Sequence, residues 1–347
     1  MGPGPVRAVR FADGALWALD QTQLPWREHE LELCGAEDVV GALQRLSIRG
    51  APLIGVAAAY GVALELLREP DGLDRACDSL IAARPTAVNL IHAVRRVHAA
   101  AAALPVGPER AEAALAEARA LHAEEEAASD TMARHGADLL TGRRRILTHC
   151  NTGALAAPGR GTALAVIAEL ADRGQLDRVL ACETRPLLQG ARLTVYELRR
   201  LGIEHALIVD GAAAGLIAGG EVDAVIVGCD RVAANGDVAN KVGTYGHALA
   251  AAAAGIPFVV AGPSTTIDPA TPTGAEITIE ERDPDEVRRL TVGGGEASRP
   301  LTVDGTPCRN PAFDVTPAGL VTALVTDRGI AQPVTAASVA TLVGRRA

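Results

Sequence analysis

The chain has 347 residues, 48% of them hydrophobic and 22% charged, and a net charge of −9 at pH 7. These values are those of a folded globular protein and exclude a disordered chain or a fibre. The excess of acidic side chains also argues against nucleic acid or an anionic membrane surface as a partner. The longest apolar stretch, residues 51–67, is interrupted by Gly55, Gly61 and Glu65, and the N-terminus lacks a signal-peptide core. We therefore expect a cytoplasmic protein without a membrane span.

The first part of the chain predicts a short β-ribbon followed by helices. Residues 6–32 alternate apolar and polar side chains around Asp13-Gly14, a dipeptide typical of a hairpin turn. Helical spacing begins at residue 36, and Pro52 suits the first turn of a second, buried helix that reaches residue 67. Further helices are expected over residues 71–83, 86–103 and 109–140. The last of them, rich in alanine and glutamate, is a candidate connector between domains.

After Thr141-Gly142 the pattern changes to short apolar or β-branched runs that alternate with helical ones. This alternation is typical of a parallel sheet with crossover helices. The expected strands are RILTHC, RVLAC, HALIVD, AVIVGC and FVVAG. Ligands of such sheets bind beyond the carboxyl ends of the strands, where this chain places Cys150, Glu183, Asp210 and Asp230. Neither a dinucleotide-binding glycine fingerprint nor a P-loop follows the first strand, so we expect no nucleotide cofactor.

Two arginines precede expected helix starts. Arg49-Gly50-Ala51-Pro52 places a guanidinium and small residues with free amides directly before a helix, an arrangement that suits a phosphate or another anion. Arg84 occupies a similar, weaker position. The alternative for both is an ordinary helix entry with a surface arginine.

Two groups that can transfer protons follow expected strands. Cys150 ends one strand and is expected to open a helix, a location that lowers the pKa of a thiol. Asp230 follows another strand. If both face one pocket, they supply acid and base without a metal ion. The alternatives are a buried inert cysteine and an aspartate that caps the next element.

The six cysteines include no closely spaced pair, which favours a reduced compartment over a disulfide framework. Cys150, Cys182 and Cys229 share an edge of the expected sheet with His149, so a zinc site is an alternative interpretation. One candidate ligand per strand is a weak signal, and the acid–base interpretation ranks above it. We expect no metal at the site.

The basic residues are 32 arginines and one lysine, Lys241, which follows Asn240. An ammonium and a guanidinium are not interchangeable at a shaped site, because the first is compact and the second planar and larger. The single lysine therefore indicates a place where a compact cation is required.

Six segments together resemble one known family. They read IRGAPLIGVAAAYGVAL, RPTAVNL, THCNTGALA, ETRPLLQGARLT, VGCDRVAANGDVANKVGTYGHALAA and NPAFDVTPAGLVTALVTDRG, spread over residues 48–329. These strings are similar to methylthioribose-1-phosphate isomerases, enzymes of methionine salvage. That family is related to regulatory subunits of the guanine-nucleotide exchange factor of translation initiation and to archaeal ribose-1,5-bisphosphate isomerase.

The resemblance implies an α/β protein with a smaller, mainly helical N-terminal domain that carries the ribbon, residues 1–140, and a Rossmann-like parallel-sheet domain, residues 141–347. It further implies a site between the domains, a phosphorylated pentose as substrate, and a homodimer. Asp230 would be the proton donor and Cys150 the second catalytic group. The implied substrate contacts are Arg49, Gly50, Ala51, Arg84, Gln189, Asn240 and Lys241.

Three alternatives stay open from the sequence. The substrate can instead be 5-deoxyribose 1-phosphate, which also needs only an apolar pocket for its 5-end. Ribose 1,5-bisphosphate would need a second cluster of cations, for which Arg185 and Arg231 are the only candidates noted. A non-catalytic regulatory subunit would have no need to keep Cys150 and Asp230 together.

Overall fold

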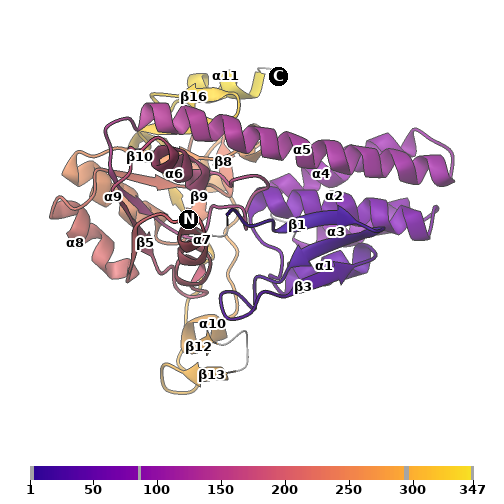
Figure 1. Ribbon diagram of the computed structural model, residues 1–347, viewed down its shortest axis with the longest axis horizontal. Coiled ribbons are helices and arrows are strands. Elements are labelled where there is room, and N and C mark those ends of the chain that lie inside the picture. Colours follow the sequence, from indigo (N-terminus) through magenta and orange to yellow (C-terminus); the bar gives the residue numbers. More distant parts are fainter. Residues whose placement is uncertain (1–3, 85–86, 293–296, 345–347) are drawn as a thin grey trace.

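The computed structural model describes residues 4–84, 87–292 and 297–344 (Figure 1). Its N-terminal part begins with an antiparallel ribbon. The ribbon consists of β1 (Val9–Ala12), β2 (Ala15–Leu19) and β3 (Glu30–Leu33). The expected hairpin turn at Asp13-Gly14 is confirmed, and both residues have the positive φ that such a turn requires. The third strand, which pairs with β2, extends the predicted hairpin to a three-stranded sheet.

Five helices follow close to their predicted positions. They are α1 (Ala36–Gln44), α2 (Ala51–Arg68), α3 (Leu73–Ala83), α4 (Val88–Ala102) and α5 (Pro108–Leu139). Residues 85 and 86, where the fourth helix was expected to begin, lie outside the described residues. Helix α2 starts at the predicted proline and is buried along most of its length, so it forms the centre of this helical half.

Helix α2 is also the one described helix long and apolar enough to cross a membrane by length and composition. Of its most apolar window, 83% is buried inside the protein. Helix α2 is surrounded by α1, α3, α4 and α5 and supplies much of the helical core. Packing inside the protein therefore explains its apolar character.

The second half is built around a seven-stranded sheet; five of its strands are the predicted ones, and β15 and β16 were not predicted. Its order is β16-β15-β10-β7-β4-β5-β6, and all neighbours are parallel except β16 with β15. The strands are β4 (Arg145–Thr148), β5 (Arg178–Cys182), β6 (His205–Ile208), β7 (Ala224–Val227), β10 (Phe258–Ala261), β15 (Ala323–Thr326) and β16 (Gly329–Ala331). The strand order reverses between β4 and β7, which is the place where doubly wound sheets bind their ligands.

Helices cover both faces of this sheet. Alternate residues of each strand enter two separate cores: one with α5, α6 (Ala163–Asp172) and α7 (Val195–Arg200), and the other with α8 (Ala213–Ala218), α9 (Thr244–Ala254) and α11 (Ala336–Gly344). Strands buried on both faces read as continuous apolar runs, and that is why they were visible in the sequence.

A second, smaller sheet was not predicted. It has the order β11-β8-β9-β14, with β8 (Arg231–Ala233), β9 (Val238–Lys241), β11 (Ile267–Asp268) and β14 (Phe313–Thr316). A short helix and hairpin, α10 (Asp285–Arg288) with β12 (Arg289–Val292) and β13 (Ala297–Pro300), extend away from the main body (Figure 1). The hairpin of β8 and β9 carries Asp230 at its start and Lys241 at its end, so the unpredicted sheet positions two predicted site residues.

Helix α5 joins the two halves, as expected from its position. Its N-terminal part, including Ala111 and Leu121, packs in the helical core, whereas Met132 and Ala137 belong to a core of the seven-stranded sheet. Figure 1 shows α5 running along both halves. One rigid helix thus contacts both halves, and it fixes the helical half relative to the strand ends described next.

Candidate active site

One cavity lies at the switch point between β4 and β7, and all nine sequence-predicted site residues line it. Its empty space, the open mouth included, is about 760 Å³. The nine residues are Arg49, Gly50, Ala51, Arg84, Cys150, Gln189, Asp230, Asn240 and Lys241. The first four come from the helical half and the other five from the sheet half, so the cavity is formed between them.

Cys150 follows β4 and Asp230 follows β7, which are neighbours in the sheet. The strand order therefore brings two residues 80 positions apart in the sequence to the same cavity. One prediction about Cys150 is wrong: it does not open a helix. The next helix, α6, begins at Ala163, after a loop in which Gly159 and Gly161 have positive φ. Cys150 therefore does not lie at a helix N-terminus.

The backbone of Cys150 is held in a conformation that non-glycine residues seldom adopt. Its φ is 62°. Its N–H donates to Thr184 Oγ1 at 2.9 Å, and its carbonyl accepts from Thr194 Oγ1 at 2.6 Å. Two threonine hydroxyls, one from each side, thereby hold the residue in the left-handed region, and strain of this kind is concentrated at functional sites.

Asp230 is anchored by its backbone, and its carboxyl group faces the cavity. Its N–H donates to Ala239 O at 3.0 Å, which fixes it at the start of the β8–β9 hairpin. Burial raises the pKa of Asp230, against the opposing effect of the positive charges of Lys241, Arg49 and Arg84. A carboxyl group in these surroundings is suited to hold a proton and give it to a substrate.

Gly50 allows Arg49 to approach the sheet half closely. Gly50 has a φ of 96°, and a Cβ there would collide with the backbone carbonyl of Ala156. Arg49 reaches across and donates through Nε to Gln21 Oε1 at 2.9 Å and through its terminal nitrogens to the Asn151 carbonyl at 3.3 Å. The amides of Leu53 and Ile54 already donate to Ala156 and Gly50, so the free part of this helix start is the turn of Gly50 and Ala51.

A buried carboxyl group behind the cavity was missed by sequence reasoning. Glu197 on α7 accepts from Asn151 Nδ2 at 2.6 Å and from the Leu155 amide at 3.3 Å. Asn151 in turn accepts from Arg49 through its side-chain oxygen. Burial raises the pKa of Glu197 to about 7. Glu197 therefore anchors the loop that carries both Cys150 and the Arg49 contact, although the segment YELRR looks like an ordinary helical surface.

We expect Glu197→Gln to remove a pH dependence of stability. The native pKa of about 7 lies above the ordinary value of 4.5, so the native state holds a proton that the unfolded state has lost, and stability falls as the pH rises towards 7. From pH 5.5 to pH 8, the ionisation of Glu197 should lower the free energy of unfolding by roughly 2 kcal/mol. Urea unfolding of the unmodified chain and of Glu197→Gln at these two pH values measures this difference. Glu125, whose pKa is also raised to about 7, is present in both and cancels. Identical pH dependence in the two proteins would contradict the assignment.

Two further arginines, Arg84 and Arg282, add positive charge to the cavity wall. Arg84 lies 3.5 Å from Glu280, and Arg282 lies 3.0 Å from the same carboxylate. Arg282 lines the cavity but was not predicted, because it stands in the acidic segment EERDPDE, which reads as a solvated loop. Glu280 holds both guanidinium groups near the cavity and balances part of their charge.

Lys241 ends β9 with its ammonium group in the cavity. Its Nζ donates to Ala312 O at 2.9 Å and lies 4.8 Å from the centre of the Phe313 ring. An ammonium group has three donors, so two are left for a ligand. The neighbouring Asn240 is buried and donates to Thr244 Oγ1 at 2.9 Å, which orients its side chain at the cavity wall.

Gln189 lines the cavity and carries an unpaired acceptor. The residue is 6% exposed, and its buried Oε1 has no hydrogen-bond partner among the described residues. It directly precedes a π-helical turn, Gly190–Thr194, that is pressed so tightly on β5 that a Cβ at Gly190 would overlap the Cys182 carbonyl. A buried acceptor without a donor is costly, and a ligand hydroxyl would satisfy it.

The remaining cavity wall is mostly small or apolar. Leu46, Leu187 and Phe313 supply apolar surface, and Cys229 contributes a second thiol. Burial raises the pKa of Cys229 to about 12, and its Sγ lies 3.4 Å from Thr266 Oγ1. Of the three cysteines considered for zinc in the sequence, the less favoured interpretation, Cys150 and Cys229 line the cavity, whereas Cys182 is buried and does not.

Comparisons with known proteins agree with this arrangement. Residues 47–333 match the model of the Initiation factor 2 subunit family. The chain is 51% identical over 346 residues to a methylthioribose-1-phosphate isomerase of Anaeromyxobacter sp. (strain K), covering 99% of this chain and 98% of the relative. A relative of the same name from Syntrophotalea carbinolica is 48% identical over 336 residues, 94% of this chain and 96% of its own length.

Two solved structures resemble the whole chain. Crystalline 5-methylthioribose 1-phosphate isomerase from Pyrococcus horikoshii OT3 superposes with a TM-score of 0.88 at 38% identity, covering 97% of this chain and 95% of that one. A structure titled translation initiation factor eIF-2B, subunit delta, from A. fulgidus gives 0.84 at 38% identity, with 98% and 100% covered. Because full-length relatives at about half identity carry one name, the chain belongs to the methylthioribose-1-phosphate isomerases, within the Initiation factor 2 subunit family.

Proposed function

We propose that this chain converts 5-methylthioribose 1-phosphate into 5-methylthioribulose 1-phosphate, an aldose–ketose isomerisation of methionine salvage. The observation that carries the proposal is the pairing of Asp230 and Cys150 at the switch point of the sheet, inside a cavity ringed by Arg49, Arg84 and Lys241. The relatives' names give the same activity.

The first chemical problem is ring opening. An aldose 1-phosphate holds its anomeric oxygen as a phosphate ester, so its ring does not open as that of a free sugar does. The ring oxygen must be protonated. Asp230 is the proposed donor, because burial raises its pKa and keeps a proton available in the cavity. After ring opening, Asp230 takes up a proton again when the carbonyl group forms.

The second problem is the transfer of hydrogen from carbon 2 to carbon 1. In one route Cys150 removes the proton from carbon 2, an enediol forms, and Cys150 delivers a proton to carbon 1. In the other route hydrogen moves directly as hydride, and Cys150 orders the reacting carbons. Turnover in deuterium oxide tests the first route: solvent deuterium at carbon 1 of the product shows that an enediol formed and that the thiol exchanged its proton, whereas hydride transfer can introduce none.

The phosphate is proposed to bind at the turn of Gly50 and Ala51, between Arg49, Arg84 and Lys241. Charged hydrogen bonds of this kind contribute about 1.5–3 kcal/mol each. Gln189 and Asn240 are proposed to bind sugar hydroxyls, since Gln189 Oε1 is a buried acceptor without a donor. Leu46, Leu187 and Phe313 give the cavity an apolar portion suited to the methylthio group.

Lys241→Ala should mainly weaken substrate binding, with KM about 10- to 100-fold higher and kcat little changed. Lys241→Arg is the sharper variant. The larger planar cation should not fit between Ala312 O and the Phe313 ring, so we expect KM to rise at least about tenfold. Steady-state kinetics measure both. Full activity of Lys241→Arg would show that any cation suffices at this position.

The ribose 1,5-bisphosphate alternative needs a second cationic cluster, and neither arginine expected for it from the sequence lines the cavity. Arg185 donates to the Pro186 and Val287 carbonyls, and Arg231 lies 3.6 Å from Asp268 and lines an adjoining cavity. The additional guanidinium group in the cavity, Arg282, is paired with Glu280 and Glu286. A 5-deoxy sugar phosphate differs only at an apolar end and remains the second candidate. A regulatory subunit would bind sugar phosphate without turnover.

Phosphorus NMR of purified protein with methylthioribose 1-phosphate, and with 5-deoxyribose 1-phosphate in parallel, tests the proposal. We expect ketose phosphate from the methylthio sugar at the higher kcat/KM. Equal turnover of both would indicate a broad 5-deoxypentose phosphate isomerase. Binding without turnover of either, by a folded protein, would favour the regulatory subunit.

We also propose a homodimer that works in the cytoplasm, with domains at residues 1–140 and 141–347. The helical half has a core of its own, formed mostly by residues 8–121 and distinct from the two cores that flank the seven-stranded sheet, which supports the domain division. The edge strand β6 supports the dimer, because Leu207 and Val209, on the strand and just after it, are 49% and 59% exposed. Exposed edge strands with apolar side chains are commonly covered by a partner.

We expect Leu207→Arg to shift a dimer towards monomer, because it puts a charge on the proposed interface. Light scattering coupled to size exclusion measures the mass of both proteins. Val303→Arg is the control, since Val303 is 80% exposed on the distant segment beyond β13. A dimer unchanged by Leu207→Arg would place the interface elsewhere.

A further inference from the structure

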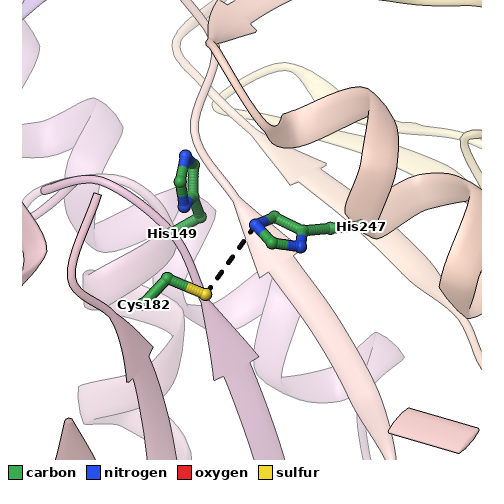
Figure 2. A group of neighbouring side chains, drawn as sticks. All are labelled: His149, Cys182 and His247. Carbon is green, nitrogen blue, oxygen red and sulfur yellow. Dashed lines mark hydrogen bonds between the residues drawn. The ribbon is translucent and has the colours of Figure 1, made fainter. Parts of the chain in front are cut away.

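Behind the active-site cavity, two histidines and a cysteine converge in the protein interior. His149 follows β4, Cys182 ends β5, and His247 lies in the first turns of α9 (Figure 2). Their exposed fractions are 1%, 0% and 6%. One candidate ligand atom from each residue lies within 4.8 Å of the others. None of the three lines the cavity, so they are separate from the residues assigned above.

The distances match the spacing of ligands on one metal ion. Cys182 Sγ lies 3.7 Å from His247 Nε2, and the two imidazole rings are 4.7 Å apart at 66° (Figure 2). On a tetrahedral zinc ion a thiolate sulfur and an imidazole nitrogen lie about 3.6 Å apart, and two nitrogens about 3.4 Å apart. The Cys182–His247 pair already has this separation. A change of at most about 1.4 Å brings the His149 nitrogen into place.

The hydrogen bonds of His149 leave the correct nitrogen free. Its Nε2 lies 2.9 Å from the Val242 carbonyl, which can only accept, so Nε2 carries the proton and Nδ1 has the lone pair. Thr184 Oγ1 is 3.5 Å from Nδ1, but the hydroxyl has a single proton and donates it to the nearer Cys182 carbonyl, 3.1 Å away. A backbone carbonyl that orients the non-ligating N–H is a usual partner of metal-bound histidines.

The surroundings also suit the charge of a bound ion. A divalent ion with one thiolate carries a net charge of +1, and the Asp210 carboxylate lies 3.9 Å from His149 Nδ1. Asp210 is itself fixed by the amides of Thr184 and Arg185, at 2.8 and 2.7 Å. Burial lowers the pKa of both histidines, His149 to about 3, so both imidazoles are neutral, the form that binds metal.

We propose that His149, Cys182 and His247 form a binding site for a borderline-soft divalent metal ion of the zinc class. On binding, the S–H bond of Cys182 breaks, a metal–sulfur bond forms, and the proton leaves to solvent. Imidazole and thiolate donors select such ions over Mg²⁺ or Ca²⁺. The ion joins the ends of β4 and β5 to α9, the elements next to Cys150 and Lys241, without touching the substrate. This proposal is independent of the proposed isomerase activity.

Cobalt(II) is the probe, because a Co²⁺–thiolate bond gives a near-ultraviolet charge-transfer band. The full-length protein is stripped with chelator, desalted and titrated with Co²⁺. We expect one Co²⁺ per chain with this band, displaced by Zn²⁺. Cys182→Ser and, independently, His247→Gln should each weaken Co²⁺ binding at least about tenfold. Circular dichroism confirms that each variant is folded, and either folded variant decides the question.

Cys150→Ser and Cys229→Ser are the matched controls, because both thiols line the neighbouring cavity. Both should keep the band. Zinc should also raise the melting temperature of the unmodified chain but not that of Cys182→Ser, since a ligand stabilises only the state that binds it. Absence of a thiolate band in the unmodified protein, or a band lost with Cys150 or Cys229 instead of Cys182, would overturn the proposal.

Discussion

Asp230→Asn is expected to lower kcat by at least about 10³-fold while substrate still binds. An amide has the size of the carboxyl group but cannot release a proton to the ring oxygen, and a positioned acid contributes about 10²- to 10⁴-fold to a rate. The substitution also removes a carboxyl group from the neighbourhood of Lys241, Arg49 and Arg84, so affinity for a phosphorylated ligand should stay equal or increase. Steady-state kinetics and calorimetric titration with substrate measure the two effects separately.

Asp268→Asn is the matched control for this variant. Asp268 is a carboxylate on β11, 3.6 Å from Arg231, and it does not line the cavity. Its kcat should stay within about threefold of the unmodified chain. The contrast with Lys241→Ala is equally informative, because that variant should lose binding and keep kcat. If Asp230→Asn and Lys241→Ala lose affinity equally, the division between proton transfer and phosphate binding is wrong.

The second large effect is expected at Cys150. Cys150→Ser should reduce kcat about 10²- to 10⁴-fold, because a serine hydroxyl is a far weaker acid than a thiol and does not supply its deprotonated form near neutral pH. The loss should appear in kcat more than in KM, since the backbone contacts with Thr184 and Thr194 do not involve the side chain. Single-turnover kinetics with enzyme in saturating excess over substrate measure the chemical step directly.

Cys229→Ser provides the control at a neighbouring strand. Both thiols line the cavity, but Cys229 lies beside Thr266, and burial raises its pKa to about 12, so it keeps its proton. A serine retains that hydrogen bond, and kcat should change less than about threefold. Equal losses in the two variants would indicate that cavity packing, rather than a specific thiol, is what the reaction needs.

Most of the architecture could be predicted because its elements are long or fully buried. Helix α2 is predicted by Pro52 and the apolar run that follows it, and the strands of the large sheet are predicted by apolar runs such as AVIVGC. The smaller sheet could not be predicted in this way. Its strands have two to four residues and mix polar with apolar side chains, as in β9, so no periodicity is visible over so short a length.

The site residues divide along a similar line. Cys150 and Asp230 were predictable because strand ends are where parallel sheets bind ligands, and Lys241 because it is the only lysine. Glu197 and Arg282 were not, since each depends on a distant partner that only the folded chain brings near. The prediction of a helix directly after Cys150 is the clearest failure. The alternation of strands and helices predicts a helix there, but a loop that contains several glycines and threonines lies between β4 and α6 and lines the cavity.

The position of Lys241 has a practical consequence. A chain with one lysine has one side-chain amine, and here that amine lies in the active-site cavity. Reagents that label or immobilise proteins through amines therefore have two targets, the α-amino group and the cavity, and attachment through Lys241 should block the site. The same fact makes reductive methylation with isotopic formaldehyde a direct reporter: the dimethyl-lysine signal in an NMR spectrum comes from one place, and bound phosphate should shift it.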